Sequence, residues 1–193
     1  MIKYILSFGL TFFMLSSVCI FAQEEMDSHS LEAMTKLANP NENHDYLKQM
    51  AGNWAVEWSH IYDPDLDPLT GKGESKNEMV LGGRFLQLSG TTQFMKEKKG
   101  ILQFIGYDNR LEYYFLIGMD EFGTYAIFAE GEYIKEENQW VFVGVDLDPT
   151  GTEDFPFRIE LTMLGKDTFT MDSYFGEDDE EIKAMSVKYT RKK

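Results

Sequence analysis

The sequence predicts an all-β domain, an up-and-down barrel of about ten antiparallel strands that follows one or two short helices. From Trp54 onward, apolar and polar residues alternate in short runs at the spacing of roughly 8–12 residues that is typical of antiparallel domains. Tight-turn sequences such as Leu81-Gly82-Gly83-Arg84 separate the runs, which favours hairpins between consecutive strands. Because an open meander would leave two unpaired edges, we expect the strands to close into a barrel.

The first 22 residues have the pattern of an export signal. Lys3 supplies a positive charge, residues 4–15 are almost wholly apolar, and Ala22 is a small residue where a signal peptidase would cut. No later apolar stretch is long enough to span a membrane, so we expect a soluble periplasmic or extracellular protein. Lipid anchoring at Cys19 is the other possibility, although Val18 is not the small residue that usually precedes an acylated cysteine.

Charge and cysteine content exclude several classes of function. The chain has 193 residues, with 33 acidic and 18 basic side chains and a formal charge of −15. Such a charge repels phosphate backbones, so nucleic acid is not expected as a partner. The single cysteine would leave with the signal segment. The mature chain therefore has no means to form a disulfide, a thiolate nucleophile or a thiolate metal site.

Residues 23–52 are expected to form a polar leader with short helices, and residues 53–193 the barrel domain. Apolar residues recur at helical spacing in two places of the leader, first Leu31, Met34 and Leu37, then Tyr46, Leu47 and Met50. Asn39-Pro40-Asn41 separates the two groups, and Gly52 can end the second helix.

Ten strands are expected in the barrel. They are Trp54–Tyr62, Glu74–Leu81, Arg84–Gln93, Gly100–Tyr107, Leu111–Met119, Thr124–Tyr133, Gln139–Val145, Phe157–Leu164, Thr168–Phe175 and Ile182–Thr190. Side chains alternate between the two faces of a strand. Several of these strands carry apolar residues on both faces, so alternation does not decide which face points into the barrel.

The start of the first strand resembles the lipocalin or calycin superfamily. Gly52-Asn53-Trp54 has the G-x-W form of that superfamily, in which the tryptophan packs at the closed end of the barrel beneath a basic residue from the last strand. The resemblance implies that Arg191 takes this role over Trp54. A cation over an indole face contributes about 0.5–2 kcal/mol and would join the first strand to the last.

A more specific resemblance, over residues 44–191, is to the uncharacterised bacterial family called domain of unknown function 1579, which looks lipocalin-like. The matching segments are Met50-Ala51-Gly52-Asn53-Trp54, Gly71-Lys72-Gly73-Glu74, Leu81-Gly82-Gly83-Arg84-Phe85-Leu86, Gly106-Tyr107-Asp108, Asp148-Pro149-Thr150-Gly151, Arg158 and Tyr189-Thr190-Arg191. The resemblance implies a barrel and often an export signal, but no established substrate or catalytic residue. Family members often carry a tryptophan where this chain has Ile117-Gly118-Met119-Asp120, a difference that bears on ligand preference.

The residues suggest a barrel that holds a small apolar or amphipathic ligand in an aromatic-lined cavity. Candidate lining residues are Trp58, Tyr62, Tyr113, Phe115 and Trp140. His60 and Arg158 are candidates to orient the polar end of the ligand, because an inward charge needs a partner. Ordinary core packing for the aromatic residues, and an outward ion pair for Arg158, are the alternatives.

Two other functions stay open at this point. One is an enzyme of low specificity, a hydrolase or isomerase that would use His60 with a carboxylate such as Glu57. No G-x-S-x-G sequence supports serine hydrolysis. The other is a structural envelope protein whose barrel is filled by its own side chains.

A calcium site is a further hypothesis. Asp63, Asp65, Asp67 and Glu74 stand at positions 1, 3, 5 and 12 of an EF-hand-like loop, and carboxylates are ligands that calcium prefers. Pro68 occupies position 6, where that loop needs a glycine, and the flanking segments are expected strands. A solvated acidic loop is therefore the simpler interpretation, and no cofactor is assigned.

Overall fold

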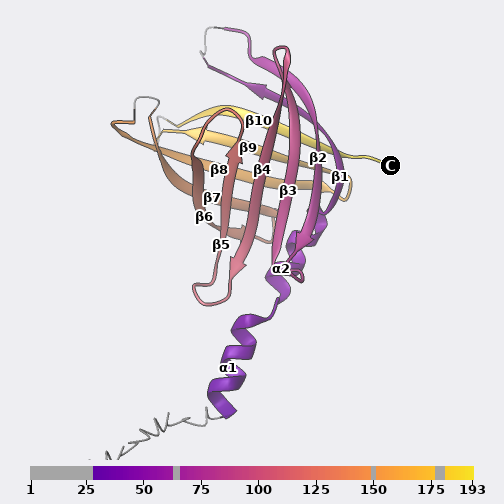
Figure 1. The fold of residues 1–193 in the computed structure, drawn as a ribbon, viewed down its shortest axis with the longest axis vertical. Helices are drawn as coiled ribbons and strands as arrows, with labels where there is room; N and C mark the ends of the chain where they lie inside the picture. Colours follow the sequence, from indigo (N-terminus) through magenta and orange to yellow (C-terminus); the bar gives the residue numbers. More distant parts are fainter. Residues whose placement is uncertain (1–27, 63–65, 149–150, 177–180) are drawn as a thin grey trace, which may run out of the picture.

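The computed structural model describes residues 28–62, 66–148, 151–176 and 181–193, and these form a closed barrel of ten antiparallel strands (Figure 1). The strands are β1 (Gly52–His60), β2 (Leu69–Val80), β3 (Phe85–Phe94), β4 (Glu97–Asp108), β5 (Tyr113–Asp120), β6 (Ala126–Ile134), β7 (Gln139–Leu147), β8 (Asp154–Gly165), β9 (Thr168–Phe175) and β10 (Ile182–Arg191). Each strand pairs with its neighbours in sequence, and β1 pairs with β10. The predicted meander barrel is confirmed, whereas the proposed signal segment and Cys19 lie outside the described residues.

The barrel closes along the β1–β10 ladder, so none of the ten described strands is an open edge. The register runs from Trp54 opposite Arg191 to His60 opposite Met185. A register shift between Lys183 and Met185 marks an irregularity in the β9–β10 ladder. The register places Trp54, Trp58 and His60 of β1 on one face, and Trp54 is fully buried. The even-numbered residues of β1 therefore face the interior.

The connection between β2 and β3 is a tight turn with left-handed backbone. Leu81, Gly82 and Gly83 have φ angles of 50°, 69° and 85°. Glycine adopts such angles without a steric penalty, which explains the Gly82-Gly83 pair between two apolar runs. The predicted hairpin is present here.

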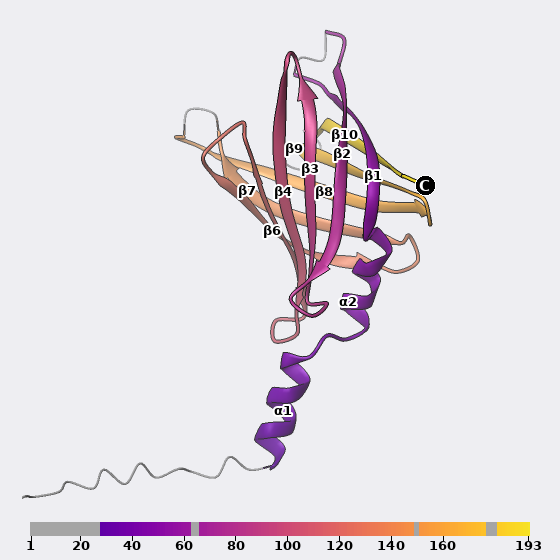
Figure 2. The same cartoon turned by 45° about the vertical axis from the view of Figure 1, so that its right-hand side comes forward.

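Two short helices and a 3₁₀ turn precede the barrel. They are α1 (Ser28–Ala38), α2 (Glu42–Leu47) and the 3₁₀ helix η1 (Lys48–Met50). Asn41 caps α2 by accepting a hydrogen bond from the Asn43 backbone N–H at 3.0 Å. Figures 1 and 2 show α1 extending away from the barrel and α2 lying against one end of it. No described helix has the length and apolar character to cross a membrane.

The end of the barrel nearest α2 is closed and filled. Leu47 and Met50 from the helical segment are fully buried there, together with Trp54, Trp140 and Phe169 from the strands. The Met50 carbonyl accepts hydrogen bonds from Trp54 Nε1–H at 2.9 Å and from Asn77 Nδ2–H at 3.0 Å. The segment α2–η1 (residues 42–50) therefore closes this end of the barrel, and we call it the stopper. The interior on the other side of Trp54 holds the candidate site.

Candidate binding cavity

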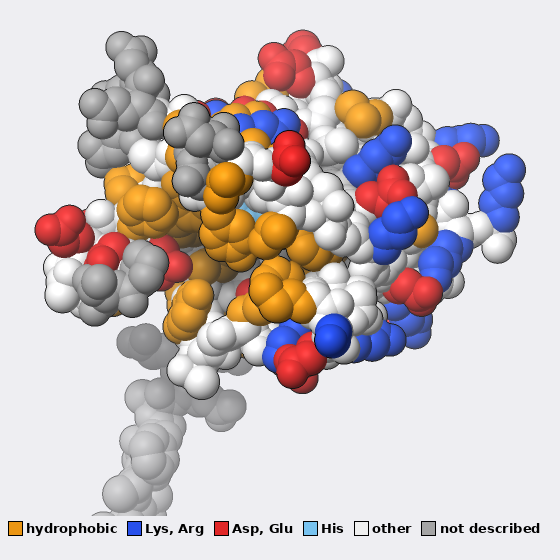
Figure 3. Space-filling model, turned by 90° about the horizontal axis from the view of Figure 1, so that it is seen from above, with side chains coloured by type: hydrophobic (Ala, Val, Ile, Leu, Met, Phe, Trp, Pro, Cys, Tyr) orange, Lys and Arg blue, Asp and Glu red, His pale blue; other side chains and the backbone are white. Residues whose placement is uncertain are grey.

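A cavity of about 450 Å³ occupies the half of the barrel away from α2. All ten strands contribute to its lining, which is mostly apolar. The lining extends to Tyr62, Phe122 and Tyr125, which lie in the strand connections at that end. Figure 3 views the molecule from this end and shows hydrophobic side chains gathered around a hollow. The barrel is therefore filled at one end and hollow at the other.

Tyr189 forms the floor of the cavity, and a stack of fully buried aromatic rings lies beneath it. The ring of Tyr189 lies parallel to that of Phe169 at a centroid distance of 4.1 Å, and Phe169 meets Trp54 edge-on at 4.7 Å. Burial raises the pKa of the Tyr189 hydroxyl. This hydroxyl stays protonated, and the floor carries no charge.

Trp58 forms one wall of the cavity, and the opposite residue on β2 is Gly71. A Cβ atom at Gly71 would lie 2.3 Å from the Trp58 ring, so only glycine leaves room for the indole. Trp58 Nε1–H donates a hydrogen bond to the hydroxyl of Thr92, which is itself buried. The indole is thus held by both packing and a hydrogen bond.

More aromatic rings continue from Trp58 towards the mouth. Phe94 stacks with Trp58 at 6.1 Å, and Phe122 contacts Phe94 edge-on at 5.2 Å. His60 and Tyr62 lie 3.9 Å apart, centroid to centroid, and both line the cavity. The mouth is therefore bordered by aromatic faces, and Tyr62 is 64% exposed.

His60 faces the cavity without a carboxylate partner among the described residues. Burial lowers its pKa, and no charged group among the residues that the structure describes contributes to that shift. Glu57 lies on the outer face of β1, where it pairs with Lys72 at 3.2 Å. The described residues therefore do not assemble the histidine and carboxylate pair that the enzyme hypothesis requires.

Tyr113 and Phe115 do not line the cavity, which corrects their predicted position. Their neighbours Tyr114 and Leu116 are buried in the interior, so alternation turns Tyr113 and Phe115 outward. Phe115 packs on Phe85 across the outer face, at a centroid distance of 6.0 Å. The glycine between these two rings, Gly106, leaves the space that they fill.

Trp140 points inward but lies in the filled half of the barrel, which also corrects its predicted position. It is fully buried, and its ring lies 4.4 Å from Tyr133 and 6.2 Å from Tyr114. Tyr133 in turn contacts Tyr46 of α2 at 4.6 Å. Trp140 therefore belongs to the aromatic packing that joins the strands to α2 at the closed end.

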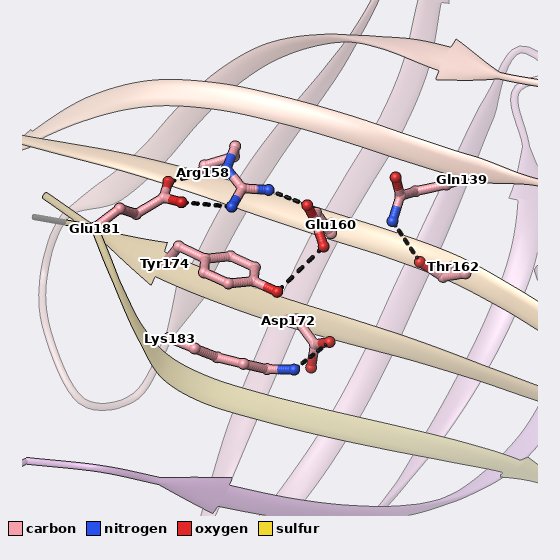
Figure 4. A network of polar contacts seen from close by, with 8 residues as sticks. All are labelled: Gln139, Arg158, Glu160, Thr162, Asp172, Tyr174, Glu181 and Lys183. Atoms are coloured by element: carbon pink, nitrogen blue, oxygen red, sulfur yellow. Dashed lines mark hydrogen bonds and ion pairs between the residues drawn. The ribbon is translucent and has the colours of Figure 1, made fainter. Parts of the chain in front are cut away.

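Arg158 lies on the outer face of β8, between the buried Phe157 and Ile159, and is not among the residues that line the cavity. Figure 4 shows it beside Glu181, Glu160 and Tyr174. Its guanidinium donates hydrogen bonds to Glu160 and to both carboxylate oxygens of Glu181, and it lies 4.0 Å from the Tyr174 ring centroid. These partners raise its pKa, chiefly through Glu181. The expectation that Arg158 orients a ligand is corrected, because its charge is neutralised outside the barrel.

Trp54 and Arg191 join the two ends of the chain at the closed end. The Arg191 guanidinium lies 4.1 Å from the Trp54 ring centroid. It also donates hydrogen bonds to the carbonyls of Ala51 at 2.7 Å and Gln49 at 2.9 Å. Arg191 therefore lies over the Trp54 ring, the contact that the lipocalin resemblance implies.

The described part of the acidic loop gives no support to a calcium site. Asp63 and Asp65 lie outside the described residues, and Asp67 is exposed. Glu74 pairs with Lys192 at 2.9 Å, which lowers the pKa of its carboxyl group. Within residues 28–62, 66–148, 151–176 and 181–193, no three His, Cys, Asp or Glu side chains are placed to hold a metal ion.

The chain matches a known protein family. A family model described as "Protein of unknown function (DUF1579)" matches residues 39–191. The chain belongs to the DUF1579 family. The search of curated proteins found no match.

Solved structures support the fold of this DUF1579 chain. The crystal structure of Rv2717c from M. tuberculosis has a TM-score of 0.57 and 14% identity, covering 80% of this chain and all (100%) of that one. A structure of EF1p2_mFAP2b bound to DFHBI has a TM-score of 0.36 and 11% identity, covering 77% of this chain and 98% of the other. The first likeness supports the fold alone, and the second is too weak to support an argument.

Several cavity residues of the DUF1579 barrel were missed by the sequence reasoning. They are Phe94, Gln103, Asp120, Phe122, Tyr125 and Asp146. Phe94 was detectable, since it continues the inward alternation of Leu88 and Thr92. Phe122 and Tyr125 lie in the β5–β6 connection, where no alternation applies, and only the closed barrel brings them to the mouth.

Proposed function

We propose that this DUF1579 protein is an exported binding protein that holds one small apolar or amphipathic molecule in the hollow half of its barrel. The cavity carries the proposal, because about 450 Å³ falls within the range of roughly 300–1,000 Å³ that is usual for ligand sites. The export step rests on the N-terminal sequence pattern, with the signal segment at residues 1–22.

The distribution of packing supports a binding role over a purely structural one. Protein interiors are close-packed, and the α2 end of this barrel obeys that rule. The other end keeps an apolar lining around open space. An apolar surface left unfilled in this way is typical of a ligand site.

The experiment is a titration with Nile red, a neutral dye that fluoresces in apolar surroundings. Ile127 lines the cavity, whereas the next residue, Phe128, is 63% exposed on the outer face. We expect Ile127→Trp to fill the cavity and abolish saturable dye binding, while the matched variant Phe128→Trp binds like the natural chain. Circular dichroism checks that both variants are folded. Equal binding by both variants would contradict a site inside the barrel.

A further inference from the structure

Three acidic residues border the cavity, and two of them have no ion-pair partner among the described residues. Asp120 is the last residue of β5 and Asp146 lies near the end of β7, and both strands end at the open side of the barrel. Glu74 also borders the cavity, but its carboxylate is paired with Lys192. Asp120 and Asp146 have no ion-pair partner among the described residues.

No Lys or Arg side chain lines the cavity in the described part of the chain. Lys99 shares the inward-facing register of Ile101 and Gln103 on β4, yet its ammonium group is paired with Glu97 at 2.6 Å. Arg158, the sequence-based candidate for an anion partner, is neutralised on the outer face. An anionic ligand would therefore meet two carboxylates in the lining and no cation that is free to bind it.

The aromatic cluster at the mouth offers the complementary attraction to a cation. Asp120 accepts a hydrogen bond from the Phe122 backbone N–H at 2.8 Å, which holds its carboxylate beside the Phe122 residue. Phe122 contacts Phe94, and Phe94 stacks on Trp58. Ring faces attract ammonium groups, and such aromatic cages bind quaternary ammonium ligands in other proteins.

We infer that the cavity selects amphiphiles with a cationic polar end, such as an alkylammonium, over those with a carboxylate end. The apolar body of the ligand lies towards Tyr189 and its ammonium group lies at the mouth between Asp120, Asp146 and the aromatic cluster. This inference rests on the proposed function and adds the chemical class of the ligand.

The test compares three ligands of equal chain length: decyltrimethylammonium, decanol and decanoate. The two ionic ligands are kept below their micelle concentrations, and decanol is kept below its solubility limit. Isothermal titration calorimetry with the natural chain measures each Kd. We expect decyltrimethylammonium to bind about tenfold more tightly than decanol, and decanoate to bind more weakly than decanol. The double variant Asp120→Asn and Asp146→Asn should lose most of the preference for the cation while decanol binding stays unchanged.

A matched double variant controls for the overall negative charge. Glu130 and Glu132 are exposed on the outer face of β6, so Glu130→Gln with Glu132→Gln removes the same charge away from the cavity. It should keep the preference of the natural chain. Equal affinities for the three ligands, tighter binding of decanoate, or an equal loss in both double variants would overturn the inference but leave the binding function intact. Failure of all three ligands to bind would instead contradict the proposed function.

Discussion

At the scale of single residues, the barrel depends on a joint between its two ends. Arg191 on the last strand covers the indole of Trp54 on the first, and its hydrogen bonds reach the carbonyls of Gln49 and Ala51 just before that strand. One side chain therefore ties together β10, β1 and the helical stopper. Loss of this side chain would loosen the closed end.

We expect Arg191→Gln to lower the free energy of unfolding by about 2 kcal/mol, because it removes a cation–π contact and charge-assisted hydrogen bonds. Urea unfolding followed by tryptophan fluorescence measures the change. Lys188→Gln, an exposed position on the same strand, serves as the control and should unfold like the natural chain. Equal midpoints for the two variants would show that the joint contributes nothing to stability.

Some side-chain contacts could be predicted from the sequence, and others could not. The contact between Trp54 and Arg191 is what the resemblance of Gly52-Asn53-Trp54 to the lipocalin G-x-W form implies. The sequence allows either an inward or an outward Arg158. The closed sheet turns it outward between the buried Phe157 and Ile159. Its partner Glu181 lies far along the chain and reaches it only after β8, β9 and β10 pair. Contacts of this kind have no local signal in the sequence.

At the scale of elements, the short segment α2–η1 sets which half of the barrel is filled. Leu47 is fully buried in the closed end, whereas Leu37 of α1 is 44% exposed. We expect Leu47→Ala to lower the free energy of unfolding by about 3 kcal/mol, because it leaves a cavity in a packed core. The matched variant Leu37→Ala should have little effect in the same urea titration. A similar small effect at both positions would contradict the role of the segment as a stopper.

The ten strands could be predicted from alternation and turn residues, and the short leader helices from apolar residues at helical spacing, but the inward face of β5 could not be predicted. Tyr114 and Leu116 fill the interior, while Tyr113, Phe115 and Ile117 on the other face are also apolar and only partly exposed. The outer face of the barrel packs its own aromatic side chains, as Phe85 and Phe115 do beside Gly106. Two apolar faces on one strand leave the direction to be decided by the closed sheet.

At the scale of the whole molecule, the three tryptophans are distributed over the two halves of the barrel. Trp54 and Trp140 are fully buried in the filled half, and Trp58 lines the cavity. Whether the interior was hollow or filled could not be predicted from the sequence, because both states use the same inward-facing residue types. The division into halves follows from how far the stopper and its aromatic neighbours extend into the barrel.

The most direct test of a ligand cavity is an NMR titration of the three indole N–H signals with decanol, assigned by single Trp→Phe variants. The account predicts that the Trp58 signal shifts saturably while those of Trp54 and Trp140 stay in place. A Trp58 signal that does not move up to the solubility limit of decanol, or three signals that shift together, would contradict a binding site in the open half of the barrel.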